Sequence, residues 1–388
     1  MTDLAVSASG LLRRFSELGV LEWADVHPAQ HLCFLYGERD ERVALAAALA
    51  VRALRAGSLC VDLTEVAGTV GAWERPDAGQ AGQPGQPGAE APLAVPDDAW
   101  PEAEGWLAAV TASPAVALGD RPTELRPLRL VAGLLYLERY FADQETVRSG
   151  VLTRLGPAPA PLGAVPAEPT ADPRAADQDA AVASALTRGL TLIAGGPGTG
   201  KTHVIARIVR AFTTGGSPAL VALAAPTGKA AARMTESLRR EGLDGPGGRF
   251  TASTVHRLLG WKAGSRSRFR HDAANPLPHD VVIVDELSMV SMTLMARLLA
   301  ALKPTARLIL VGDPDQLASV EAGAVLADLT GAPAVAPAVV RLRHNFRFAG
   351  TIQELATAIR EGDAEGALAA LGRDGAEVRL LDPDRARG

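Results

Sequence analysis

The chain has 388 residues, 47% of them hydrophobic, and a formal net charge of −5 at pH 7. This length allows two or three domains with cores of their own. The acidic balance argues against a surface that binds nucleic acid throughout, although it is compatible with a local basic track. No uncharged apolar run of about 18 residues occurs, and no basic and apolar signal opens the chain. We therefore expect a cytoplasmic protein with no membrane contact.

Residues 1–65 are predicted to form a small, mostly helical domain that docks a partner. Apolar residues recur at helical spacing from Leu11 to Leu18 and from Ala44 to Leu54. No cluster of titratable residues with catalytic spacing accompanies them, which argues against an active site here. Cys33 and Cys60 lie in apolar runs without metal-ligand spacing, so we expect buried free thiols.

Two stretches rich in proline, glycine and alanine are predicted to interrupt the folded parts. The first is centred on residues 79–88, and its composition cannot bury enough apolar surface to offset the entropy lost on ordering. We therefore expect a flexible insert over residues 66–126. Residues 127–173 are predicted to be a connecting segment that ends in the second such stretch, 156–173.

From residue 174 the pattern changes to alternating strands and helices, which predicts an α/β lobe over 174–340 with a small insertion at about 260–279. Near-continuous apolar runs are typical of parallel strands covered on both faces. Four such runs occur, at Leu192–Ala194, Leu220–Ala225, Val281–Val284 and Leu308–Val311. Since ligands of such sheets bind at the carboxyl ends of the strands, the polar residues that follow these runs are predicted to form one site.

A glycine-rich stretch directly after the first run fits the signature of a phosphate-binding loop between a strand and a helix. Small residues let successive backbone N–H groups wrap a triphosphate, and the following helix points its positive end at the anion. Lys201 is predicted to reach the β and γ phosphates, and the Thr202 hydroxyl to ligate Mg²⁺. The expected nucleotide-binding residues are Gly195, Gly196, Pro197, Gly198, Thr199, Gly200, Lys201 and Thr202. The alternative is a glycine-rich turn with an incidental lysine.

Acidic and amide residues follow the third and fourth runs. Asp285 is predicted to hold Mg²⁺ directly or through water, and Glu286 to polarise the water that attacks the γ-phosphate. The side-chain amide of Gln316 can sense the γ-phosphate through a hydrogen bond that is lost after hydrolysis. An acidic strand-end turn and a Gly-Asp-Pro turn are the alternatives, and the phosphate loop in the same chain favours the catalytic interpretation.

The second run is followed by Thr227 and Lys229, at another junction of loop and helix that suits a phosphate. Because the first loop is predicted to hold the triphosphate, we expect a nucleic-acid phosphate here. Residues 229–270 carry ten lysines and arginines against three acidic residues, with Trp261 and Phe269 among them. Positive charge with aromatic stacking is typical of single-strand binding, while a solvated basic face is the alternative.

These motifs, in this order, resemble the RecD family of superfamily 1 DNA helicases, the alpha subunits of the exonuclease V complex RecBCD. The resemblance covers residues 178 to about 350. It implies a RecA-like P-loop NTPase lobe that uses ATP and Mg²⁺, with Gln178 against the adenine base. It also implies that four residues lie near single-stranded DNA: Thr227, Lys229, Thr254 and His256. Among the arginines that follow residue 340, it favours Arg347 over Arg341 and Arg343 as the contact of the γ-phosphate.

The function implied by this resemblance is an ATP-dependent 5′–3′ DNA helicase subunit that acts in double-strand-break repair by homologous recombination. Its expected partners are single-stranded DNA, duplex DNA ends, and RecB-like and RecC-like subunits in a heterotrimer. Motifs of the family's second RecA-like lobe do not occur before Gly388, so residues 341–388 are expected to begin an incomplete second lobe. Such a chain is expected to bind nucleotide but to hydrolyse it and unwind DNA poorly.

Two alternatives stay open. One is a stand-alone RecD-like or relaxase-type helicase, although helix-hairpin-helix signals and a relaxase histidine cluster do not occur in the N-terminal sequence. The other is a non-catalytic, nucleotide-gated scaffold subunit that binds DNA ends.

Overall fold

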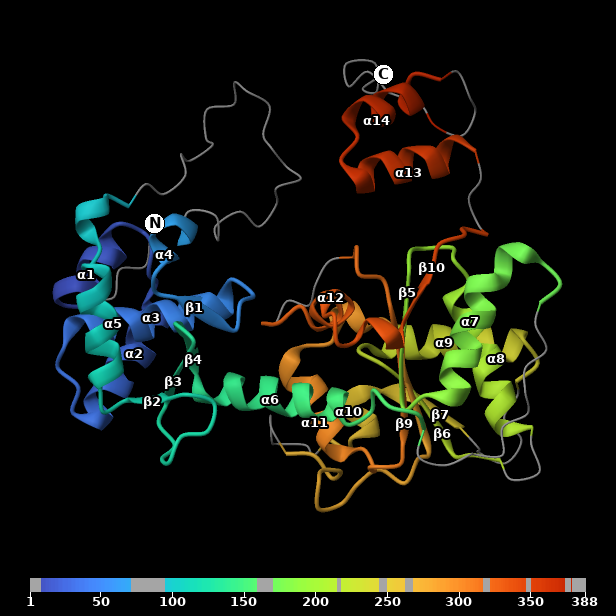
Figure 1. Cartoon of the computed structure of the whole chain (residues 1–388), viewed down its shortest axis with the longest axis horizontal. Helices are drawn as coiled ribbons and strands as arrows, with labels where there is room; N and C mark the ends of the chain where they lie inside the picture. The colour runs from blue at the N-terminus through green and yellow to red at the C-terminus, as the bar shows by residue number, and fades with distance from the viewer. Residues whose placement is uncertain are drawn as a thin grey trace. The chain divides into compact units, whose positions relative to one another are not determined.

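The computed structural model describes residues 8–70, 95–158, 170–214, 218–243, 250–261, 268–316, 322–346, 350–373 and 378. The chain forms two compact units (Figure 1). The first contains the described residues up to Thr146 together with Ser291–Thr293, and the second contains most of the remainder. In the described part of the chain, no helix combines the length and the apolarity that crossing a membrane requires.

The first unit is built around one buried helix, α3 (Glu41–Arg55). Asp40 caps its start by accepting a hydrogen bond from the backbone N–H of Arg42. Nearly every side chain between Val43 and Ala53 is buried, which is typical of a central helix. Three helices pack against it: α1 (Gly10–Glu17), α2 (Trp23–Tyr36) and α5 (Ala103–Ala112).

A four-stranded sheet completes the first unit, in the order β1-β4-β3-β2. Its strands are β1 (Cys60–Asp62), β2 (Val116–Leu118), β3 (Leu128–Val131) and β4 (Leu134–Leu137). Short helical turns are α4 (Val66–Thr69) and η2 (Asp97–Ala99), and α6 (Glu138–Leu152) follows β4. Because β4 pairs with β1, the structure corrects the predicted domain end at residue 65 and places the start of the predicted 127–173 connector inside this unit. Both cysteines are free thiols, and Cys33 is buried while Cys60 is half-buried.

The prediction of a flexible insert over residues 66–126 is wrong for residues 95–126. Residues 95–126 contain α5 and β2, and they contribute Trp106 and Val110 to the core of the first unit. Composition taken over the whole stretch averages these apolar side chains with the proline and glycine of residues 79–88, which lie outside the described residues.

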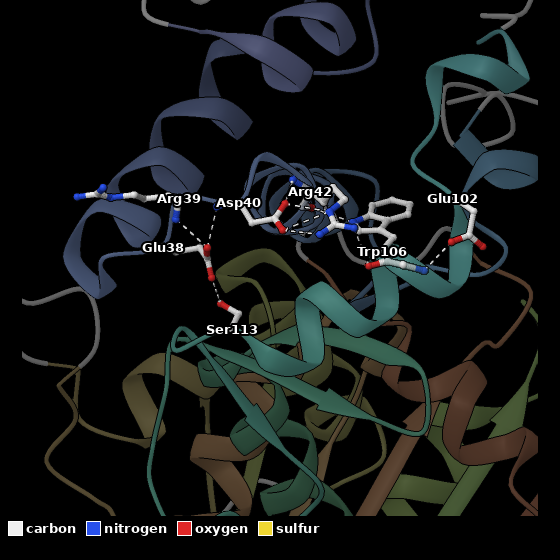
Figure 2. A network of polar contacts seen from close by, with 8 residues as sticks. Glu38, Arg39, Asp40, Arg42, Glu102, Trp106 and Ser113 are labelled. Atoms are coloured by element: carbon white, nitrogen blue, oxygen red, sulfur yellow. Dashed lines mark hydrogen bonds and ion pairs between the residues drawn. The ribbon is translucent and has the colours of Figure 1, made fainter.

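Polar contacts hold α5 to the start of α3 at both of its ends (Figure 2). The indole N–H of Trp106 donates to the carbonyl oxygen of Arg42 over 2.8 Å, and the Arg42 guanidinium donates to the carbonyl oxygen of Gly105. At the other end, the Ser113 hydroxyl donates to the Glu38 carboxylate. The helix after the glycine-rich stretch is thus an integral part of the first unit.

The second unit contains a parallel sheet of six strands in the order β10-β5-β9-β8-β6-β7, which confirms the predicted α/β fold class. The strands are β5 (Leu190–Gly195), β6 (Val221–Ala225), β7 (Phe250–Thr254), β8 (Val281–Val284), β9 (Arg307–Gly312) and β10 (Val339–Leu342). The four predicted apolar runs form the adjacent central strands β5, β9, β8 and β6. The edge strands β7 and β10 escaped prediction because hydroxyl and arginine side chains interrupt their apolar pattern.

Helices cover both faces of this sheet. On one face, α7 (Ala176–Thr187), α8 (Lys201–Thr213) and α9 (Gly228–Arg240) share a hydrophobic core with the strands. Figure 1 shows α11 (Met292–Ala301) and α12 (Val325–Gly331) on the other side of the sheet from α7 and α8. The shorter elements are η3 (Pro173–Ala175), α10 (Val255–Leu258), η4 (Leu287–Met289) and η5 (Ala336–Ala338).

The predicted boundary between residues 340 and 341 is wrong, because β10 spans it and pairs with β5 from Val339 to Leu342. An edge strand of the nucleotide lobe therefore continues past the predicted end. Beyond it, α13 (Thr351–Glu361) and α14 (Ala364–Leu371) pack against each other. That these helices begin a second RecA-like lobe stays a prediction.

Substitution of Trp106 by alanine tests whether α5 belongs to the folded first unit. We expect Trp106→Ala to lower the free energy of unfolding by about 3–5 kcal/mol, because it opens a cavity and removes the bond to Arg42. Chemical denaturation followed by fluorescence measures this. Phe34→Ala is the control, because Phe34 is 81% exposed and its loss should change stability by less than about 0.5 kcal/mol. Equal stability of the two variants would contradict the assignment.

Candidate functional site

The glycine-rich loop lies between the end of β5 at Gly195 and the start of α8 at Lys201. Gly198 and Gly200 have φ angles of +82° and +84°, a left-handed conformation that glycine adopts without strain. A Cβ at Gly200 would lie 2.3 Å from the Gln178 amide nitrogen, so a larger residue would displace the Gln178 side chain from the loop. The Lys201 ammonium donates to the carbonyl oxygens of Gly195 (2.6 Å) and Gly196 (3.0 Å), which holds its charge at the loop.

Segments from both ends of the second unit fix this loop. The amide of the buried Gln178 donates to the Thr199 carbonyl oxygen over 3.0 Å. The backbone N–H of Phe346 donates to the carbonyl oxygen of Gly198 over 2.9 Å. The side-chain amide of Asn345 donates to the carbonyl oxygen of Pro197, also over 2.9 Å. The bond from Gln178 to the loop was not among the contacts that the resemblance implies. Its expected contact with adenine stays a prediction.

Asp285 and Glu286 follow β8 directly, at the carboxyl edge of the sheet. The Asp285 carboxylate accepts a hydrogen bond from the Glu286 backbone N–H over 2.9 Å. Glu286 has a φ of +54°, a left-handed conformation that costs a residue with a Cβ about 1–2 kcal/mol. Such strain is found where function dictates the direction of a side chain, which supports a role for Glu286.

Burial raises the pKa of Asp285 to about 6, because it disfavours the charged carboxylate. The Glu286 N–H lowers this pKa, the Glu286 charge raises it, and the Lys201 charge lowers it. The carboxylate of Asp285 and the hydroxyl of Thr202 are both hard oxygen donors of the kind that Mg²⁺ prefers, with phosphate and water oxygens as the other ligands. The donor set therefore fits a magnesium nucleotide.

A cleft of about 550 Å³ brings most of the predicted site residues together. Its walls include five residues predicted to act on the nucleotide or its metal, namely Lys201, Thr202, Asp285, Glu286 and Gln316. They come from the start of α8 and from the segments that follow two strands, β8 and β9, which is the convergence that a parallel sheet predicts. Arg347 lies outside the described residues, and its predicted contact with the γ-phosphate is untested.

The predicted DNA-binding residues divide between two places. Thr227 and Lys229 line the same cleft as Lys201, whereas Thr254 and His256 are not among its lining residues. Both threonines also cap helices: Thr227 accepts from the N–H of Ala230 at the start of α9, and Thr254 accepts from that of Arg257 at the start of α10. Capping alone therefore accounts for the two hydroxyls, and the DNA contacts stay predictions.

Sequence reasoning missed several residues around the loop. Arg233 and Arg240 line the cleft together with Lys229, all from α9. Arg233 follows Lys229 by four residues and Arg240 follows Arg233 by seven, so the three lie on one face of a helix. This spacing is visible in the sequence and could have identified them. On the other flank of the loop, His203, Glu241 and Phe346 line a second cavity. They lie on three separate segments, so only the folded chain brings them together.

Comparison with known proteins agrees with this geometry. A family model described as an AAA domain matches residues 178–322, and one described as the N-terminal domain of the RecBCD enzyme subunit RecD matches residues 17–136. A RecBCD enzyme subunit RecD of Mycobacterium tuberculosis is 47% identical over 98% of this chain and 63% of its own length. The counterpart from Mycolicibacterium smegmatis is 47% identical over 96% of this chain and 64% of its own length. The chain thus spans a little under two thirds of these relatives.

More distant similarities are shorter. An ATP-dependent RecD2 DNA helicase of Deinococcus radiodurans is 46% identical over 37% of this chain and 18% of its own length. Among solved structures, the Pif1 helicase from Candida albicans covers 54% of this chain and 49% of its own, with 20% identity and a TM-score of 0.34. A match to an N-terminal RecD domain is followed in this chain by a match to an AAA domain, and over the residues it spans the chain is similar to RecD proteins.

Proposed function

We propose that this chain is an ATP-dependent DNA helicase subunit of the RecD type, whose cleft binds ATP and Mg²⁺. The observation that carries the proposal is the meeting of Lys201, Thr202, Asp285, Glu286 and Gln316 on the walls of one cleft. A cation, a metal-binding pair, an acid and an amide are the parts that phosphoryl transfer requires. The names of the relatives support the same class of activity.

Each residue of the cleft has a distinct part in the proposed hydrolysis. Lys201 and the loop N–H groups bind the β and γ phosphates, so that the γ-phosphate faces the ends of β8 and β9. Thr202 and Asp285 would hold Mg²⁺, which supplies positive charge to the phosphate oxygens. Glu286 orients a water for attack and accepts its proton, and Gln316 donates a hydrogen bond to the γ-phosphate.

The cations of α9 support the proposal of a DNA substrate, and the names of the relatives support the proposed partners. Lys229 and Arg233, together with Thr254 and His256, are proposed to contact the backbone of single-stranded DNA during 5′–3′ movement. Since the relatives are named as RecBCD subunits, RecB-like and RecC-like chains are proposed as partners in a cytoplasmic heterotrimer. Its role would be the processing of duplex DNA ends in double-strand-break repair by homologous recombination.

Removal of the loop cation tests the nucleotide site. We expect Lys201→Ala to weaken ATP binding by about 100-fold, because it deletes charge-assisted hydrogen bonds to two phosphates. Calorimetric titration of the full chain with Mg-ATP measures the affinity. Lys303→Ala is the matched control, since Lys303 pairs with Asp280 and does not line the cleft. Undiminished ATP affinity in Lys201→Ala would refute the site.

Glu286→Gln separates catalysis from binding. The amide keeps the size of the side chain but cannot accept the proton of the attacking water. We expect ATP affinity within about threefold of the parent and hydrolysis slower by about 100-fold. Single-turnover assays with the chain in excess over labelled ATP and with single-stranded DNA present detect even slow hydrolysis. Loss of ATP binding in this variant would contradict the proposed division of roles.

Lys229→Ala decides which phosphate this lysine serves. If Lys229 contacts DNA, the variant should bind single-stranded DNA about fivefold more weakly, with a shallower dependence on salt, and bind ATP as the parent does. Fluorescence anisotropy of a labelled oligonucleotide at several salt concentrations, beside ATP calorimetry, gives both values. Weakened ATP binding with unchanged DNA binding would reassign Lys229 to the nucleotide, as its place in the cleft allows.

A further inference from the structure

A second cavity, of about 570 Å³, lies on the other flank of the phosphate loop. The loop contributes Gly196, Gly198 and Gly200 to its lining, and α8 contributes Lys201, Thr202 and His203. The end of α9 and the segment after β10 supply Ser237, Arg240, Glu241 and Phe346. Nothing in the proposed hydrolysis uses His203 or Glu241.

The proposed function fixes which part of the nucleotide this cavity can take. It shares five lining residues with the cleft, namely Gly198, Lys201, Thr202, Ser237 and Arg240. Asp285, Glu286 and Gln316 line the cleft but not this cavity. A triphosphate bound with its γ end at those three residues leaves its nucleoside on the opposite flank of the loop. This inference therefore rests on the proposed nucleotide site.

Glu241 and His203 form a polar pair on the wall of this cavity. The His203 Nδ1 and Glu241 Oε1 atoms lie 3.2 Å apart, and the two side chains are 46% and 36% exposed. The Glu241 carbonyl oxygen accepts a hydrogen bond from the Arg210 guanidinium over 2.7 Å, which ties the end of α9 to α8. The Arg210 bond thus fixes the backbone of Glu241 against α8, and the His203 contact orients its carboxylate.

We propose that Glu241, positioned by His203, accepts hydrogen bonds from the ribose hydroxyls of the nucleotide and selects ribonucleotides over deoxyribonucleotides. A carboxylate accepts hydrogen bonds and repels phosphate, so within a nucleotide it can pair only with the hydroxyl and amine donors of the nucleoside. It has more acceptor positions than the contact with His203 uses, and the vicinal hydroxyls of ribose are matching donors. The Phe346 ring, 44% exposed, offers an apolar face to the base.

Comparison of ATP with 2′-deoxy-ATP tests this proposal in the full chain. We expect the parent to bind Mg-ATP about tenfold more tightly than Mg-dATP, the value of one hydrogen bond to a charged group. Glu241→Ala should reduce this ratio to about one, and His203→Ala should reduce it in part because the carboxylate is no longer positioned. Glu354→Ala is the control, a carboxylate on α13 that pairs with Arg373 and lines neither cavity. It should change both affinities equally and keep the ratio.

Each of four results would overturn the inference. A parent chain that binds ATP and dATP equally, or a Glu241→Ala variant that keeps the parent ratio, refutes it while the nucleotide site stands. A Glu241→Ala variant that alters only the preference for ATP over inosine triphosphate assigns the carboxylate to the base amine instead. Failure of the parent to bind either nucleotide refutes the nucleotide site itself. In that case Lys201→Ala and the parent show the same lack of ATP binding.

Discussion

The close approach of neighbouring groups to the phosphate loop is the constraint on which the second unit depends. Backbone N–H groups can surround a phosphate only where no side chain intervenes, and the loop must also stay rigid. A Cβ at Gly195 would lie 2.6 Å from the Thr199 hydroxyl and 3.0 Å from Leu342. Since Leu342 belongs to β10, the edge strand packs directly on the loop. The N–H of Phe346, four residues later, bonds to the loop as well.

Charge in the cleft is balanced by its ligand rather than by the protein alone. Burial outweighs the attraction of Lys201 and raises the pKa of Asp285 to about 6. A cation in direct contact would favour the ionised carboxylate far more strongly than a lysine at a distance. The proposed metal and triphosphate would add opposite charges beside Asp285 and the three cations of α9 that line the cleft, Lys229, Arg233 and Arg240. These charges suit the proposed metal nucleotide better than they suit the metal or the triphosphate alone.

The loop and the central sheet could be predicted because their physical requirements are local. Glycines for close approach and unbroken apolar runs for buried strands are visible in the sequence itself. Helix α5 was not predicted because the segment before it is rich in proline and glycine. Strand β10 was not predicted because an arginine interrupts its short apolar run. The hydrogen bonds from Gln178 and Phe346 to the loop join residues that are far apart in the chain, so no local sequence pattern predicts them.

Helix α9 links the two cavities and limits how a ligand can lie. Its 13 residues span about 20 Å, so Lys229 near its start and Glu241 after its end cannot contact the same chemical group. Lys229 lines the cleft with Asp285 at one end, and Arg240 and Glu241 line the second cavity with Phe346 at the other. The proposed function assigns these two ends to different ligands, the DNA backbone at Lys229 and the nucleoside at Glu241. DNA at Lys229 and a nucleotide at Glu241, bound as proposed, would therefore contact the same helix, so that a shift of α9 would act on both ligands.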